Sequence, residues 1–193
     1  LMLMYDGLIG GFEQAIYGNA IKVLGGNIQI HAAGYQAEFG QYPLLPLKDD
    51  QAVLKAARAL PQVISVTRRI NTSGMATSPE GAFGVVVVGI EPELEEPLSL
   101  LAQNITAGRY LASADEDVVF IGKGLAEALG VSLGDRITLV GRAAHEQMRQ
   151  RTMTVIGIYD LGMGEIEKRT VYISLAEAQD LYGLEGQVTE VIV

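Results

Sequence analysis

The stretch that most constrains this fold is Val118–Leu139, whose sequence is VVFIGKGLAEALGVSLGDRITL. An apolar run leads into a Gly-x-Gly turn at Gly122 and Gly124, and a short helical segment follows as far as Gly130. A second turn at Gly134 precedes another apolar run. This pattern predicts a strand, one or two helical turns, a tight turn and a strand. We expect a β-rich core to form around this unit.

The glycine pair invites comparison with a dinucleotide-binding fingerprint. Such a fingerprint needs a third glycine, so that helix and strand pack closely, and an acidic residue about 20 positions further on. The third position here is Glu127, which is bulky and charged. The predicted helix is also shorter than the dozen or so residues that a crossover to a parallel strand takes. We therefore interpret the glycines as turn residues, expect Leu125, Leu129 and Leu133 to fill the core, and predict no cofactor.

Composition excludes several classes of protein. The formal charge is -9 and the 14 Lys and Arg residues are scattered, which argues against nucleic-acid binding, because the phosphate backbone needs a basic face. Hydrophobic residues make up 49% of the chain, enough for a core and too many for disorder. Without cysteine the chain has no disulfide and no thiol nucleophile. No apolar run approaches the ~18 residues of a membrane-spanning helix.

The rest of the chain reads as alternating helices and strands. The pattern predicts one amphipathic, glycine-rich helix over residues 1–24, either an ordinary docking helix or, because it starts apolar and without a cap, the membrane-proximal end of a transmembrane helix. Asp49 is a candidate N-cap for a helix over 50–60, whose Leu54, Ala57 and Leu60 are expected to face the core, and Ser174 is one for a helix over 175–182. The remaining expectations are strands at 27–31, 63–70, 82–90, 153–159, 169–173 and 187–193, a loop at 32–46, a polar turn at 71–81 and a basic interruption at 141–151.

Catalytic motifs are missing. The two histidines, His31 and His145, do not form H-E-x-x-H, and no serine lies in G-x-S-x-G. A metal site could be built from the acidic run Glu91–Glu96, but carboxylates beside prolines are more typical of a solvated linker. We predict no catalytic residue, no metal site and no enzyme activity. The alternative is a small soluble enzyme built on a β-barrel, with carboxylates such as Asp115, Asp117 or Asp135 in a cleft.

The order of short motifs resembles the extracytoplasmic domain of MacB/LolC/FtsX-type ABC transporter permeases. The motifs are GNIQIH with Gly34-Tyr35, ALP before VISV, VVGI at 87–90, TAGRY at 106–110, the 118–139 stretch, TVIGI at 154–158, and VYI at 171–173 with Ala178-Gln179. Together they extend over nearly the whole chain. The resemblance implies an α+β fold in the periplasm, carried by a permease of the inner membrane.

The resemblance also implies an internal division. Residues 1–24 would be a membrane-proximal stalk, 25–92 and 170–193 a porter-like α/β part, and 93–169 an inserted β-rich, Sabre-like part. In addition, helix 50–60 with PQVISV and helix 175–182 with GQVTEV look like a short duplicated unit.

The implied function is to couple ATP-driven movement of membrane helices to a lipoprotein or another envelope substrate. The expected partners are a cytoplasmic ATPase, a second permease subunit and a periplasmic protein. In lipoprotein-releasing permeases a hook between two Sabre strands docks the carrier protein. The matching position here is 141–151, which is shorter and lacks the hook's prolines; it predicts partner-binding residues Arg142, His145, Arg149 and Arg151. An envelope sensor domain without a transport role is a further alternative.

Overall fold

The structure is a computed structural model that describes residues 28–35, 42–144 and 147–193. The predicted stalk helix 1–24 and His145 lie outside the described residues. The helices are α2 (Asp50–Arg58), α3 (Pro92–Glu95), the 3-10 turn η1 (Glu96–Leu98), α4 (Leu100–Gln103), α5 (Lys123–Leu129), α6 (Gly164–Glu167) and α7 (Leu175–Tyr182). The strands are β1 (Gln29–His31), β2 (Thr67–Ser78), β3 (Gly81–Ile90), β4 (Ile105–Gly108), β5 (Val118–Gly122), β6 (Arg136–Arg142), β7 (Met148–Tyr159), β8 (Thr170–Ser174) and β9 (Glu190–Ile192).

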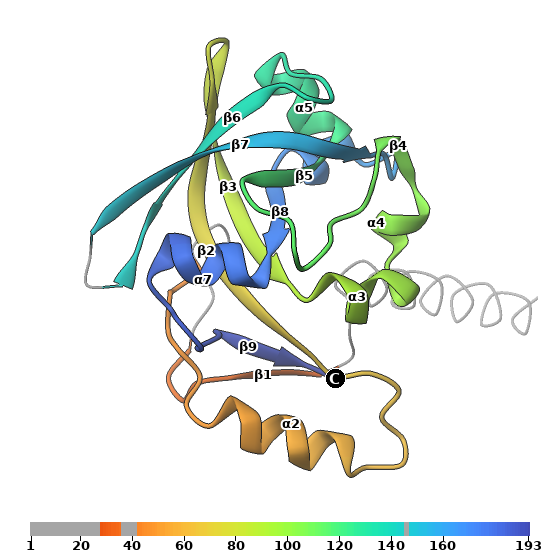
Figure 1. Cartoon of the computed structure of the whole chain (residues 1–193), viewed down its shortest axis with the longest axis vertical. Coiled ribbons are helices and arrows are strands. Elements are labelled where there is room, and N and C mark those ends of the chain that lie inside the picture. Colours follow the sequence, from red (N-terminus) through yellow and green to blue (C-terminus); the bar gives the residue numbers. More distant parts are fainter. Residues whose placement is uncertain (1–27, 36–41, 145–146) are drawn as a thin grey trace, which may run out of the picture.

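Six strands close on themselves in the upper part of the molecule (Figure 1). They follow the order β2-β3-β8-β5-β7-β6, and β6 pairs back to β2, so each has a hydrogen-bonded neighbour on both sides. The β3–β8 and β5–β7 pairs are parallel, and the other four are antiparallel. We call this arrangement the strand ring. The 118–139 unit is confirmed as strand, helix, turn and strand, but β5 and β6 meet only through β7.

Two helices supply side chains to the core of the strand ring. From α5, Leu125 and Leu129 are fully buried, and Gly130 ends the helix with a φ of 63°. From α7, Ala178 and Tyr182 are fully buried. Tyr182 fits because Gly141 of β6 has no side chain: a Cβ there would lie 2.5 Å from the tyrosine ring. The core is therefore completed by helices that follow directly on the ring strands β5 and β8.

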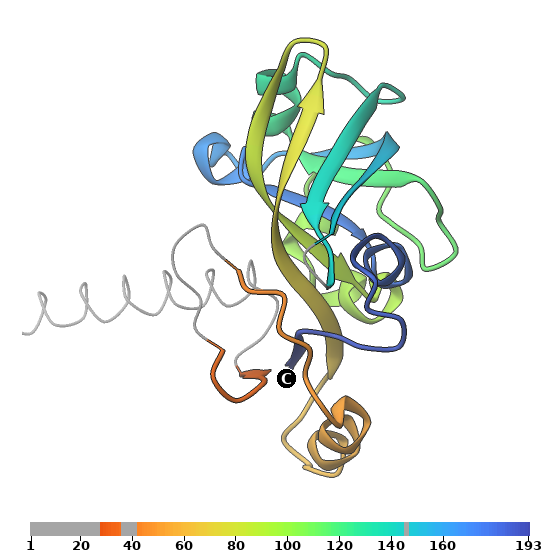
Figure 2. The ribbon, with the colours of Figure 1, turned by 90° about the vertical axis from the view of Figure 1, so that its left-hand side faces the viewer.

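A smaller layer lies below the strand ring (Figure 2). Strand β9 pairs with β1 on one side and with Thr67–Arg69 of β2 on the other, both antiparallel. Helix α2 packs on this three-stranded sheet through Leu54 and Ala57, which contact Val191. We call β1, β9, the first three residues of β2 and α2 the chain-end layer, because it holds both ends of the described chain. Strand β2, which follows PQVISV, and strand β9, which overlaps the end of GQVTEV, lie side by side in it.

Strand β2 corrects two expectations. Residues 71–78 belong to the strand, whereas the sequence predicted a polar turn, and residues 63–66, predicted as strand, lie outside it. Residues 71–78 are held in the sheet by eight pairs with β3 on one side and, at 74–77, by four pairs with β6 on the other. Cross-strand pairing therefore overrides a local composition that is typical of turns.

The basic stretch 141–151 also belongs largely to strands. β6 and β7 pair from Arg136↔Thr154 out to Arg142↔Met148, so only residues 143–147 connect them. The returning strand begins at Met148 and not at Met153 as predicted. The hairpin extends beyond the neighbouring strands in Figure 1.

Some local expectations were wrong. Leu60 and Leu133, expected in the core, are 56% and 46% exposed. Asp49 has a φ of 59° and its side chain caps nothing, whereas Ser174 does cap α7 by accepting a hydrogen bond from the Glu177 backbone. The strand ring takes strands from each predicted segment: β2 and β3 from 25–92, β8 from 170–193, and β5 to β7 from 93–169.

Candidate functional site

The four residues predicted to bind a partner are distributed over the β6–β7 hairpin. Register places Arg142 opposite Met148 on the outer face, while Arg149 and Arg151 lie opposite Gly141 and Leu139, which face the core. The hairpin strands therefore separate one arginine from the other two. The structure does not bring the four together as one patch, and it does not describe His145.

The two arginines on the inner face contact α7. The Arg149 guanidinium donates to the Asp180 carbonyl oxygen at 2.9 Å. Arg151 forms ion pairs with Glu177 at 2.5 Å, Asp180 at 2.6 Å and Asp117 at 2.8 Å. Burial raises the pKa of the Glu177 carboxyl, and the Arg151 charge opposes that rise. These contacts join the hairpin to the helix that leads directly to β9.

The chain-end layer contains a polar row that the sequence did not suggest. His31, Glu190 and Arg69 stand opposite one another on β1, β9 and β2, so their side chains share one face of the sheet. Glu190 is 1% exposed, and burial raises its pKa to about 7. Its Oε1 accepts a hydrogen bond from the Asn71 amide at 2.5 Å, and its Oε2 lies 3.4 Å from His31 Nε2. In the sequence, Glu190 is one of several polar residues in the predicted strand 187–193, and nothing in the local pattern singles it out.

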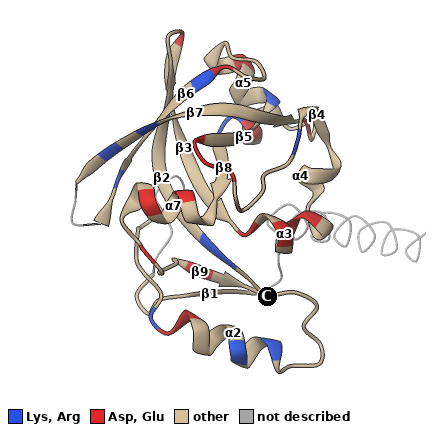
Figure 3. Ribbon diagram, viewed as in Figure 1, with Lys and Arg blue, Asp and Glu red and all other residues tan. Residues whose placement is uncertain are grey.

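Three further ion pairs fix the start of β2 against the α3 region and α2. The buried Arg69 donates to both carboxylate oxygens of Glu95, at 2.8 and 2.6 Å. Arg68 bonds Glu91 at 2.8 Å and lies 3.5 Å from Asp50 at the start of α2. The acidic run 91–96 was predicted to be a solvated linker; two of its carboxylates are instead structural anchors (Figure 3).

The carboxylates of the enzyme alternative each have a separate partner. Asp115 forms a two-pronged ion pair with Arg109, Asp117 binds Arg151, and Asp135 accepts from the Ser132 backbone. Within the described ranges, no group of three or more His, Asp and Glu could hold a metal ion. No helix in the described part of the chain is long and apolar enough to cross a membrane.

The Gly-x-Gly pair serves packing between helices. A Cβ on Gly124 would lie 2.3 Å from the Gly164 carbonyl oxygen, and one on Gly122 would lie 2.6 Å from Glu167 Cβ. Because neither glycine has a side chain, α6 can pack directly against the start of α5.

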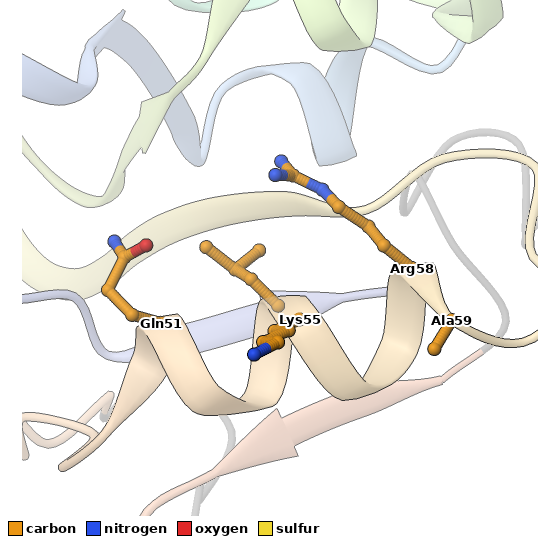
Figure 4. Close-up of a pocket in the computed structure, with 5 residues that line it drawn as sticks. Gln51, Lys55, Arg58 and Ala59 are labelled. Carbon is orange, nitrogen blue, oxygen red and sulfur yellow. The ribbon is translucent and has the colours of Figure 1, made fainter.

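Another candidate surface is an open hollow on α2, of about 580 Å³. Gln51, Lys55 and Arg58 line it together with Leu54 and Ala59 (Figure 4). The two cations follow one another on a single face of the helix, and no carboxylate of the described residues lines the hollow. Nothing in this geometry selects a ligand.

Comparison with known sequences places these features in a family. The model of the family described as "MacB-like periplasmic core domain" matches residues 2–193. A lipoprotein-releasing system transmembrane protein LolC from Xylella fastidiosa (strain 9a5c) is 26% identical over 147 residues, which are 73% of this chain and 35% of the relative. The LolC of Neisseria meningitidis serogroup B is 29% identical over 112 residues, 54% of this chain and 27% of the relative. The chain thus spans about a third of the length of these relatives.

Solved structures share the fold. The extracellular domain of the noncanonical ABC-type transporter YknZ from Gram-positive bacteria superposes with a TM-score of 0.56 at 17% identity, covering 85% of this chain and 81% of that one. The periplasmic region of MacB from Actinobacillus actinomycetemcomitans gives a TM-score of 0.50 at 15% identity, covering 72% and 62%.

Proposed function

This chain belongs to the MacB-like periplasmic core domain family, and from that premise we propose that it transmits movement between membrane helices and a periplasmic substrate or partner. It is the periplasmic domain of a MacB/LolC-type ABC transporter permease. The proposal concerns what this domain does there: it passes on a mechanical displacement and carries out no chemistry itself.

One observation carries the proposal. Ile28 and Val193, at the two ends of the described chain, exchange backbone hydrogen bonds of 3.1 and 2.9 Å. In a permease whose membrane helices continue from these two residues, both connections meet at one point of the chain-end layer. We infer that a displacement of membrane helices joined to these ends enters the domain at this point. The buried ion pair of Arg69 with Glu95 then passes it to α3 and to β2, which continues into the strand ring.

Membership of the family supports a proposal for the partners of this domain. We propose a cytoplasmic ATPase that supplies the energy, a second permease subunit in the complex, and a lipoprotein as substrate. The lipoprotein proposal is supported by the names of the LolC relatives, each of which is called part of a lipoprotein-releasing system. We further propose that the predicted stalk 1–24, the porter-like segments and the Sabre-like segment move together, because strands of the latter two share one closed ring.

The β6–β7 hairpin is the proposed docking element for a periplasmic protein. We assign recognition to Arg142, His145 and the outer face, where Met148 is 66% exposed. Arg149 and Arg151 would act indirectly, because their contacts with α7 hold the hairpin in place. Exposed charges at the edge of an interface mainly change the rate at which the partners associate.

The coupling proposal is tested by inserting a flexible Gly-Ser segment immediately before Ile28 in the full-length permease. The insertion should abolish lipoprotein release from the inner membrane, because slack in the connection absorbs the displacement, while ATP hydrolysis by the complex continues. The same segment inserted between Pro79 and Glu80, in the exposed β2–β3 turn, is the matched control and should preserve release. Normal release with the first insertion would refute coupling through this end.

Docking is tested separately by Arg142→Glu, with Arg136→Glu at the other end of the same strand as control. Reversal at Arg142 should slow association with the periplasmic partner, and reversal at Arg136 should not. Equal association rates for the two variants would remove the hairpin tip from the proposal.

A further inference from the structure

The polar row of the chain-end layer contains two acceptors that face each other. The Nδ1 atom of His31 lies 3.4 Å from the Thr189 carbonyl oxygen, which can only accept, so this contact is a hydrogen bond in the neutral tautomer whose hydrogen lies on Nδ1. The other ring nitrogen, Nε2, then presents a lone pair to Glu190 Oε2 at 3.4 Å. An ionised carboxylate and a bare imidazole nitrogen repel each other at this distance. One proton between them removes the repulsion, on whichever atom it rests.

The surroundings leave Glu190 little alternative. The other carboxylate oxygen of Glu190, Oε1, already accepts a hydrogen bond from the side-chain Nδ2 of Asn71. The side-chain Oδ1 of Asn71 is buried with no hydrogen-bond partner among the described residues. Arg69, the nearest cation along the row, is bound to Glu95 through both carboxylate oxygens. Tyr35 stacks on the His31 ring at 3.9 Å and 1° between planes. Within the described part of the chain, the titratable and charged groups around the pair are Tyr35, Tyr42, Arg69, Glu95 and Tyr172.

We propose that His31 and Glu190 share one exchangeable proton, and that this proton fastens β1 to β9 at the point where the chain ends enter the domain. With the proton present, the pair is neutral overall and joins the two strands. Without it, a buried carboxylate faces a lone pair and β1 loses its side-chain attachment. The functional meaning rests on the proposed coupling: a proton would set how tightly the incoming chain is held to the strand ring.

The direction of the pH dependence follows from the two groups. Burial raises the pKa of Glu190 to about 7, so its folded form holds the proton more strongly than an unfolded chain does. This contribution is complete below the ordinary glutamate pKa and is lost as pH rises through about 7. Burial lowers the pKa of His31, so its contribution has the opposite sign and is lost on acidification below its ordinary range. The Glu190 shift is the larger, and β1 should therefore loosen as pH rises from 6 to 8.

Hydrogen exchange of the Ile28 and Val193 amides, corrected for the intrinsic effect of pH, measures this loosening on the whole chain. Protection should fall roughly tenfold between pH 6 and pH 8, the ratio set by a carboxyl pKa of about 7 in the closed form and an ordinary value in the open form. In Glu190→Gln the side-chain amide donates permanently to Nε2, so protection at pH 8 should remain as high as at pH 6. Glu80→Gln, at the exposed β2–β3 turn, should retain the tenfold fall.

Three results would overturn the proposal. The first is an unchanged protection factor in the natural chain across this range, and the second is the same fall in Glu190→Gln. The third is a nitrogen NMR spectrum that places the hydrogen of neutral His31 on Nε2, because that nitrogen would then already donate to the carboxylate. Failure here leaves the linker-insertion test untouched. Conversely, failure of that test would not affect the amide exchange.

Discussion

The strand ring and the chain-end layer are stabilised in different ways. In the ring every strand is paired on both sides, and its core is apolar, with Leu125, Ile137 and Ile173 fully buried. The chain-end layer pairs strands of only three residues, and the inward face of its sheet carries His31 and Glu190. A closed apolar body resists deformation, whereas a short ladder held by ionisable groups responds to its surroundings. The two ends of the described chain, Ile28 and Val193, lie in the chain-end layer.

The largest expected effect that tests this comparison is a cavity in the buried cluster on the outer face of the ring strand β5, which contains Phe120. Phe120 is fully buried against Tyr110, Tyr159 and Tyr172. Phe120→Ala should lower the free energy of unfolding by ~3–5 kcal/mol in urea titrations. Leu54→Ala, beside the open hollow on α2, should cost only about 2 kcal/mol, the low end of its class, because the layer can collapse around it. Equal losses would mean that the layer is as rigid as the ring.

Next in size is the buried ion pair between the layer and α3. Arg69→Met leaves Glu95 buried without its cation and should cost ~3 kcal/mol. The double variant Arg69→Met with Glu95→Met removes both charges and should recover most of that loss. A double variant no more stable than the single one would show that packing, and not the unpaired charge, sets the cost.

The third test concerns the fit of α7 into the strand ring. A Cβ on Gly141 would lie 2.5 Å from the Tyr182 side chain. Gly141→Ala should therefore lower the stability of the strand ring by ~1–3 kcal/mol through overpacking. Gly84→Ala in β3 is the matched control, because nothing lies within 4 Å of its Cβ position. Thermal unfolding of both variants gives the comparison, and a similar melting temperature for the two would remove steric fit as the reason for Gly141.

The smallest expected effect compares the starts of α7 and α2. Ser174 accepts a hydrogen bond from the Glu177 backbone, so Ser174→Ala should cost about 1 kcal/mol. Asp49 makes no such bond, and Asp49→Ala should lose nothing through capping. Because Asp49 adopts a positive φ, Asp49→Gly should be neutral or slightly stabilising. Denaturant midpoints for the three variants are sufficient, and a loss in Asp49→Gly equal to that in Ser174→Ala would contradict the assignment, because glycine removes the side chain without backbone strain.

Sequence patterns predicted the elements whose signal is local. The apolar run 82–90 is confirmed as a central strand, and the glycine-marked unit 118–139 and the Ser174 cap are confirmed as well. The missed features depend on distant residues: β2 continues through Ser78 because β3 and β6 pair with it, and Arg149 and Arg151 face α7 because of strand register. Glu190 could not be singled out, since its partners lie 159 and 119 positions away at His31 and Asn71.

The sequence by itself determined the local elements, because turns and strand cores are encoded by neighbouring residues, and the resemblance of its motif order to a known family indicated the α+β class and the family. Only the tertiary structure decided which strands close the ring and which charged side chains meet inside the chain-end layer. Pairing across more than a hundred positions depends on the summed packing of both partners, and no local pattern specifies it.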